Sequence, residues 1–263
     1  MASEIAGALL ALLMTAGCCI WWTVIRQLRA GVRPWRKYEG PSAEGEFGGL
    51  CATVIVWLLI PSLALLGLGA RPEEESLRRV LVIGLGQVLT FIVVGSMVVP
   101  GARRRLSFGI RFDHVPQQML DGVVGFLACV PPVAIGAVLT SPFRDEKTQN
   151  LLLRILEHNP GWQSTAAILV VAGVLAPLVE ELVFRSVLQS GLQSVLRTRN
   201  AIVLVALLFS AVHGWPDMLP LFPLALLLGL LFHLRRSLIA VVTTHLLFNA
   251  TNLAYALLTE SAN

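Results

Sequence analysis

Charged residues are scarce in this chain, and their scarcity sets the class of protein. Of the 263 residues only 14% are Asp, Glu, Lys or Arg, whereas 56% are apolar. A soluble domain has about a quarter charged and about half apolar residues. The mean hydropathy is +0.75. These values exclude an ordinary soluble domain and predict a protein that crosses the lipid bilayer several times.

Signals of other protein classes are also missing. The four cysteines include no Cys-x-x-Cys pair and have no neighbouring His, so they indicate neither a metal site nor a redox site. No internal repeat, low-complexity tract or long polar segment indicates a second domain. The net charge of +4 comes from short basic blocks between apolar runs, which is not the pattern of a nucleic-acid-binding surface. We therefore predict one membrane domain, residues 1–263, with the bilayer as its surroundings and no nucleic-acid partner.

Apolar runs of about 20 residues, the length of a membrane-spanning helix, recur along the chain. They predict an all-α fold, a polytopic helical membrane protein with about eight transmembrane helices, because helices satisfy their own backbone groups in lipid. The eight runs are Ile5–Ile25, Leu50–Gly69, Val80–Pro100, Leu120–Thr140, Ser164–Leu188, Ala201–His213, Leu219–Leu234 and Leu238–Leu258. The sixth and seventh runs are short.

No basic residue precedes the first run, which argues against a signal peptide, since such a peptide carries its positive charge before the apolar region. With eight spans, 13 of the 20 Lys and Arg residues fall on one side and 6 on the other, with Arg185 inside the membrane. The positive-inside rule places the 13 in the cytoplasm and both termini outside. The compact chain with short loops favours an integral protein of a bacterial plasma membrane.

The fifth run contains three charges, Glu180, Glu181 and Arg185. A charged residue at the centre of a membrane helix costs roughly 2.5–3.5 kcal/mol, so such residues are expected to face a protein interior or a wet cavity. Glu181 and Arg185 are four residues apart and can pair on one helix face. Pro177 lacks an amide hydrogen and is expected to bend the helix just before the carboxylates. Glu180 has no local counter-charge, which suits a general base.

Two later runs carry polar groups at helical spacing. Phe209 and His213 are four residues apart in the sixth run, and His245 and Asn249 are four apart in the eighth. Each pair is therefore expected to share one face of its helix. Polar side chains at such depth are expected to contact one another, water or a substrate.

A depth comparison links the fifth and sixth runs. If they form an antiparallel hairpin that turns near Leu196, Glu180 lies 16 residues before the turn and His213 lies 17 after it. At about 1.5 Å per residue the two side chains are at nearly the same height. We therefore expect Glu180 and His213 to face each other across the hairpin.

The ordered patterns Glu-Glu-x-x-x-Arg, Phe-x-x-x-His and His-x-x-x-Asn resemble the three motifs of the CPBP family, the CAAX protease and bacteriocin-processing intramembrane proteases. This family includes the type II CAAX prenyl endopeptidases. The resemblance covers about Ala176 to Asn252, inside a motif-bearing catalytic core of about 164–258, and Phe108-Gly109-Ile110 is also family-like. Ser186 stands where Gly is commoner in the family. The resemblance implies an intramembrane endopeptidase that acts on a membrane-associated protein or peptide without a covalent intermediate.

The resemblance also implies a role for each motif residue. Its catalytic residues are Glu180, His213, His245 and Asn249, supported by Glu181, Arg185 and Phe209. Glu180 and His213 would activate a water, and His245 and Asn249 would stabilise the oxyanion. Glu and His are acceptable zinc ligands, but no His-Glu-x-x-His occurs and the groups are spread over three helices. We therefore favour a site with no metal and no other cofactor over the alternative of a zinc site.

Two further functions are compatible with buried charges in a membrane. The first is a transporter that uses the carboxylates as a proton relay, although the chain lacks the internal repeats common in transporters. The second is a non-catalytic immunity or scaffold protein of the membrane that retains the same cavity.

Overall fold

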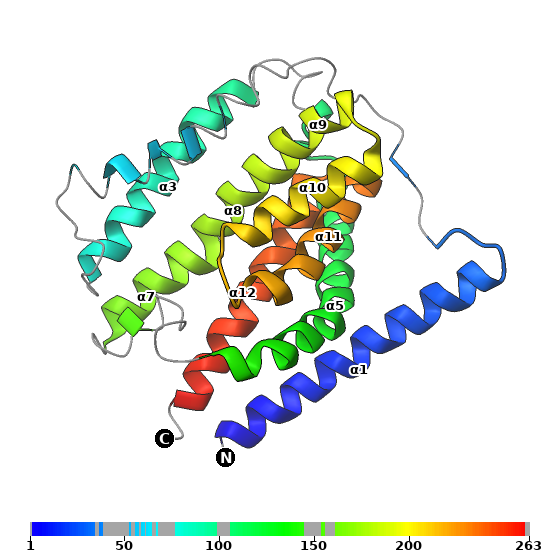
Figure 1. Cartoon of the computed structure of the whole chain (residues 1–263), viewed down its shortest axis with the longest axis horizontal. Helices are drawn as coiled ribbons and strands as arrows, with labels where there is room; N and C mark the ends of the chain where they lie inside the picture. Colours follow the sequence, from blue (N-terminus) through cyan, green and yellow to red (C-terminus); the bar gives the residue numbers. More distant parts are fainter. Residues whose placement is uncertain are drawn as a thin grey trace.

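The computed structural model describes residues 2–34, 37–38, 77–98, 106–144 and 161–260, together with 154–155 and scattered positions between 53 and 67. Within this part of the chain the regular structure is entirely helical, as predicted. Figure 1 shows the helices as one elongated bundle, with α3 on one flank and α1 on the other.

The helices differ widely in length. Those before residue 145 are α1 (Ala2–Arg29), α3 (Leu77–Val98), α5 (Val115–Thr140) and the 3-10 turn η1 (Ser141–Phe143). Those after it are α7 (Trp162–Val170), η2 (Val171–Leu175), α8 (Ala176–Glu181), η3 (Leu182–Gln189), α9 (Ser190–Val195), α10 (Thr198–Ala211), α11 (Met218–Arg235) and α12 (Leu238–Glu260).

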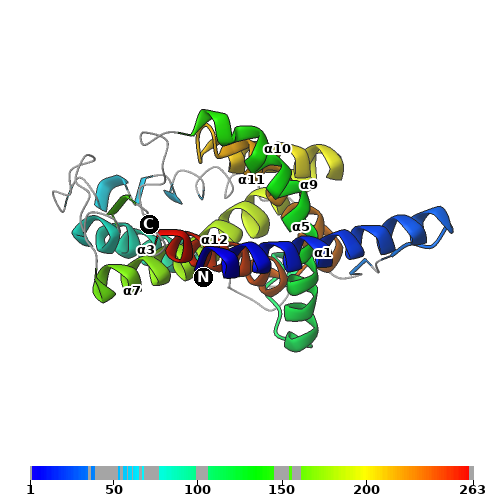
Figure 2. The same ribbon diagram turned by 90° about the horizontal axis from the view of Figure 1, so that it is seen from below.

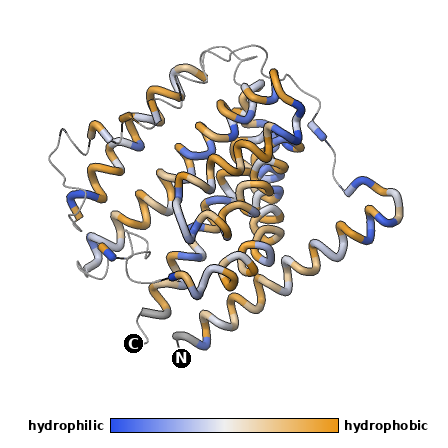
Figure 3. The backbone as a smooth tube through the Cα atoms, in the orientation of Figure 1, coloured by the Kyte–Doolittle hydropathy of each residue, from blue (hydrophilic) through white to orange (hydrophobic). Residues whose placement is uncertain are grey.

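Six of the described helical segments are long and apolar enough to cross a membrane. Apolar residues line most of the length of the outer helices α1 and α3 (Figure 3). The sixth predicted span lies earlier in the chain than expected, because α10 runs from Thr198 to Ala211 and leaves His213 beyond its C-terminus. Most of the predicted span Leu50–Gly69 lies outside the described residues. The count of eight spans therefore stays a prediction.

Residues 162–195 form one long rod made of α7, η2, α8, η3 and α9. Its η2 and η3 segments are π-helical, with i→i+5 hydrogen bonds such as the one from Ala176 N–H to the Val171 carbonyl. The next bond of that series is impossible because Pro177 has no N–H, so the Ala172 carbonyl is left without its helical donor. Just before the carboxylates, where Pro177 is expected to bend the helix, the rod therefore has a widened turn whose Ala172 carbonyl needs a donor from outside the helix.

Several segments between helices meet at one end of the bundle, which we call the basic end. The Tyr38 N–H donates to the Leu234 carbonyl at 2.7 Å, and the Leu238 N–H donates to the Gly109 carbonyl at 2.8 Å. The Arg111 guanidinium lies 4.4 Å from the centre of the Tyr38 ring. These segments belong to the basic loops that the charge count places on one side of the membrane.

The turn between α9 and α10 follows the predicted hairpin. α9 ends at Val195, Leu196 is extended, and α10 begins at Thr198. The start of α1 and the end of α12 both lie at the end of the molecule away from the basic end (Figures 1 and 2). A common side for both termini agrees with the topology expected from the charge count, and their position outside the cell stays a prediction.

α1 packs against a proline pair in α5. Pro132 cannot donate to the Ala128 carbonyl one turn earlier, and the Trp21 indole N–H donates to that carbonyl instead, at 2.9 Å. A Cβ added at Gly17 would lie 2.4 Å from the Leu127 oxygen and 2.6 Å from Pro131, so only glycine allows this approach. α1 therefore supplies the hydrogen bond that the prolines remove from α5.

Replacing Trp21 by Phe is expected to lower the free energy of unfolding by about 1 kcal/mol, because the Ala128 carbonyl loses its donor in apolar surroundings. Thermal unfolding of the purified protein in detergent measures the change. The control is Trp22→Phe, since the Trp22 side chain is 66% exposed on the same helix and makes no such bond. Equal stability of the two variants would contradict the view that the Trp21 hydrogen bond holds α1 against α5.

Candidate active site

Glu181 and Arg185 form the predicted ion pair at the centre of the rod. Their Oε2 and Nε atoms are 3.2 Å apart, and both side chains are fully buried. The Arg185 guanidinium also lies 4.6 Å from the centre of the Phe209 ring, and its Nη2 donates to the Ala225 carbonyl at 3.5 Å. A cation–π contact of this kind stabilises a desolvated cation. Arg185 therefore ties α10 and α11 to the rod.

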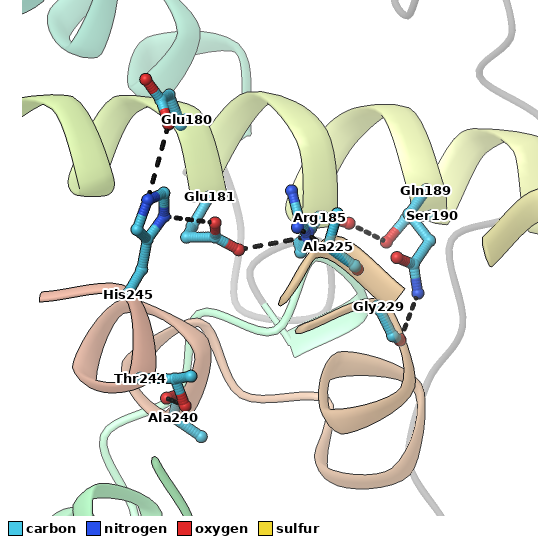
Figure 4. Close-up of polar contacts among 10 residues, drawn as sticks. All are labelled: Glu180, Glu181, Arg185, Gln189, Ser190, Ala225, Gly229, Ala240, Thr244 and His245. Carbon is cyan, nitrogen blue, oxygen red and sulfur yellow. Dashed lines mark hydrogen bonds and ion pairs between the residues drawn. The ribbon is translucent and has the colours of Figure 1, made fainter. Parts of the chain in front are cut away.

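His245 of α12 is held between the two carboxylates (Figure 4). Its Nδ1 lies 2.8 Å from Glu181 Oε1, and its Nε2 lies 3.8 Å from Glu180 Oε2. The imidazole is 3% exposed, whereas the Glu180 side chain retains 18% exposure. Sequence reasoning paired Glu181 with Arg185 alone and missed this contact, because local spacing cannot register residues 64 positions apart.

His213 lies in the exposed turn after α10. Its Nδ1 is 2.7 Å from the Phe209 carbonyl oxygen, and its ring centre is 4.9 Å from that of Phe209. The expected direct partnership with Glu180 is not seen, since no hydrogen bond or ion pair joins these two described residues. The equal-depth argument placed His213 inside a helix, but α10 has already ended there.

Phe209 is the residue that connects the two imidazoles. Its fully buried ring lies 4.9 Å from the His213 ring and 5.7 Å from the His245 ring, measured between centres. The ring also contacts Phe184 at 5.2 Å. Phe209 therefore places a rigid apolar ring between the two histidines, and its supporting role stays a prediction.

Asn249 lies one turn beyond His245 on α12, as its spacing predicts. Its Nδ2 donates to the Ala172 carbonyl at 2.8 Å, and this is the carbonyl that Pro177 leaves without a helical donor. The amide thus joins α12 to the widened turn of the rod. An amide nitrogen has two hydrogens, so this bond leaves a second donor on Asn249.

The buried cluster contains more carboxylates than guanidinium groups. Glu180 and Glu181 lie near a single guanidinium, that of Arg185, and a net charge is costly away from water. His245 is the fourth group of the cluster, and its Nε2 atom lies 3.8 Å from Glu180 Oε2. The imidazole is therefore placed between two acceptors, where it can donate to a carboxylate.

The comparisons with known proteins bear on this same segment. Residues 162–251 match one family model, described as Rce1-like: Type II CAAX prenyl endopeptidase Rce1-like. This region is Rce1-like. No curated protein and no solved structure matches the chain. The resemblance predicted from the three motifs is confirmed over residues 162–251, and every predicted catalytic residue lies within this region.

The donor set fits a metal poorly. Among the described residues, no group of three or more His, Cys, Asp or Glu side chains is arranged to hold a metal ion. A zinc site requires several such donors to converge on one point, and the described side chains do not do so.

The turn that carries His213 is tied to the end of α5 by two contacts. Arg144 Nη2 lies 2.5 Å from Asp217 Oδ1, and the Phe143 and Trp215 ring centres are 5.4 Å apart. The ion pair is partly exposed, and such pairs contribute about 0.2–1 kcal/mol. Loss of this ion pair is therefore expected to change the local stability of the turn and not that of the whole fold.

Replacing Asp217 by Asn is expected to speed amide hydrogen exchange at residues 213–217 about two- to fivefold, because the turn opens more often once the ion pair is lost. Exchange followed by mass spectrometry measures it. The exchanged pair Arg144→Asp with Asp217→Arg should restore the slow rate, and Asp113→Asn, at another ion pair, should leave the turn unchanged. A fast rate in the exchanged pair would contradict the prediction.

Proposed function

We propose that the protein is an intramembrane endopeptidase of the CAAX-protease type, which hydrolyses a peptide bond of a membrane-associated protein or peptide. The observation that carries this proposal is the contact of His245 with both Glu180 and Glu181 inside the Rce1-like region. A partly exposed carboxylate beside a buried, oriented imidazole is an arrangement suited to acid–base catalysis.

Glu180 and His213 are the groups proposed to activate water. A carbonyl oxygen only accepts hydrogen bonds, so the contact with Phe209 places the His213 hydrogen on Nδ1 and leaves the Nε2 lone pair to accept. A water held by His213 Nε2 would lose a proton to the Glu180 carboxylate as its oxygen attacks the carbonyl carbon. Glu180 would then pass that proton to the leaving amine as the C–N bond breaks.

His245 and Asn249 are proposed to stabilise the oxyanion. The Nδ1 atom of His245 faces a carboxylate acceptor, so the ring donates from Nε2 only as the imidazolium. In that form His245 would also offset the charge of one of the two carboxylates beside it. Removing one donor of this kind typically costs about 10²–10³ in rate. Glu181 would orient His245 and offset its charge in addition to pairing with Arg185.

The proposal is tested by trapping substrate. The Glu180→Gln variant, purified from its membranes, should retain intact proteins that the wild type releases as fragments, and mass spectrometry of the two samples compares them. Fragments absent from the variant membranes would identify the cleaved bond. Proton-coupled uptake of a solute would instead favour a transporter, and an identical protein profile in both membranes would favour a non-catalytic immunity or scaffold protein.

Chelation provides a separate prediction. Because the described side chains make no metal-ligand group, cleavage by a metal-free preparation is expected to persist at the same rate in EDTA or 1,10-phenanthroline. Metal analysis of the same sample serves as the control. Loss of cleavage in chelator, with recovery on adding zinc, would contradict the metal-free mechanism.

A further inference from the structure

A buried polar seam runs between the rod and α11. Three polar side chains of the rod, each four residues after the last, contact residues of α11 that lie 40 positions further along. The pairs are Arg185 with Ala225 at 3.5 Å, Gln189 with Gly229 at 2.8 Å, and Gln193 with His233 at 3.5 Å. Figure 4 shows the first two side chains extending toward α11. The two helices are therefore parallel and in register along this seam.

The seam contains buried polar atoms that the protein itself does not satisfy. Glu181 Oε2, Arg185 Nε and Nη1, Ser186 Oγ and Gln189 Oε1 are enclosed and have no hydrogen-bond partner. The Glu181–Arg185 approach of 3.2 Å is an ion pair without hydrogen-bond alignment. All four residues are fully buried. Each buried polar atom without a hydrogen bond costs about 1–3 kcal/mol of folding free energy. Five such atoms lie within residues 181–189, which indicates that a bound ligand supplies the missing hydrogen bonds.

The chemistry of these atoms identifies the ligand as water. The set mixes acceptors, such as Glu181 Oε2 and Gln189 Oε1, with the donors of Arg185. Water meets both needs, and buried waters typically make about three such bonds. Gly229 places no side chain against the amide oxygen of Gln189, since a Cβ there would be 3.0 Å from that atom. Gly229 thus lets the α11 backbone come close to Gln189, whose Nε2 donates to the Gly229 carbonyl while its Oε1 has no protein donor.

The seam leads from the catalytic cluster to solvent. At one end Glu181 contacts His245. At the other end, 12 residues along the rod, Gln193 and His233 are partly exposed at the basic end. At roughly 1.5 Å per residue this distance is about 18 Å. Polar groups recur at every turn between these two points.

We propose that a chain of water molecules occupies this seam and delivers water from the basic end to the Glu181–His245 cluster. The use of that water in peptide hydrolysis rests on the proposed function, whereas its presence in the seam does not. Gln189 is the central residue of this chain of waters, because its side chain lies midway along the seam. Its Nε2 donates to the Gly229 carbonyl of α11, and its Oε1 is left to bind water.

Hydroxyl-radical labelling tests whether water is present. X-ray radiolysis labels apolar side chains that lie beside bound water, and Ile202 of α10 approaches Gly229 of α11 beside the Gln189 amide. We expect Ile202, which is only partly exposed, to be labelled in the wild type above the more exposed Val203 and above the buried Val205. In Gln189→Leu the labelling of Ile202 should fall below that of Val203.

Kinetics then test whether the water is used. With a cleaved peptide substrate, Gln189→Leu should lower kcat about tenfold with KM unchanged, the effect of one lost buried hydrogen bond. Ser186→Ala should lower kcat in the same direction, and it serves as the second variant if Gln189→Leu does not fold. The matched control is Val187→Ile, which changes volume in the same segment without altering a polar atom.

Three results would overturn the proposal: no labelling of Ile202 in the wild type, unchanged labelling in Gln189→Leu, or lost labelling with an unchanged kcat. A wild type that labels at Ile202 but cleaves no peptide would instead count against the proposed function. The labelling experiment needs no substrate, so the two failures are distinguished.

Discussion

Replacing Glu180 by glutamine is expected to lower kcat for peptide cleavage by about 10²–10⁴-fold, the usual contribution of a general base. Glutamine has the same shape but cannot take a proton from water. KM is expected to change little, because the loss falls on the chemical step. Initial rates against a cleaved peptide in detergent measure both constants.

The same substitution should leave the fold intact. The Glu180 side chain is 18% exposed, and its contact with His245 is long, at 3.8 Å. Its carboxylate is therefore expected to contribute little to the free energy of unfolding. Thermal unfolding of Glu180→Gln should match the wild type. Asp121→Asn, which removes a carboxylate paired with Arg235 at the basic end, is the control for loss of one negative charge. Full activity in Glu180→Gln would sink the assignment of the base.

Replacing Arg185 by methionine is expected to destabilise the protein by about 3–5 kcal/mol, the cost of leaving a buried charge without its partner. Both Glu181 and Arg185 are fully buried, so the remaining carboxylate gains no solvent. The substitution also removes the cation over Phe209. Chemical unfolding in detergent, followed by tryptophan fluorescence, measures the change in free energy.

The double variant Glu181→Gln with Arg185→Met separates lost charge from lost packing. With both charges gone it should recover a substantial part of the stability, because replacing a whole buried pair is often near neutral. Arg144→Met serves as the control, since its ion pair is partly exposed and should cost at most about 1 kcal/mol. A similar cost for Arg185→Met and Arg144→Met would contradict the buried-pair interpretation.

Local rules predicted well where a single helix decides the outcome. Apolar run length predicted the helices, and four-residue spacing predicted the Glu181–Arg185 pair and the contact of Phe209 with His213. The same rules located the hairpin turn near Leu196. They failed at the end of α10, because run length cannot show where a helix stops when apolar residues continue into a turn.

The chain by itself therefore determined the helices, the motif family and the side chains that share a face, because these depend on residues within a few turns of one another. Tertiary structure alone decided the partners of those side chains. His245 reaches Glu181, and Asn249 reaches the carbonyl freed by Pro177. The polar seam likewise needs two helices in register. The rotation and depth of one helix against another depend on packing, which spacing within either helix does not specify.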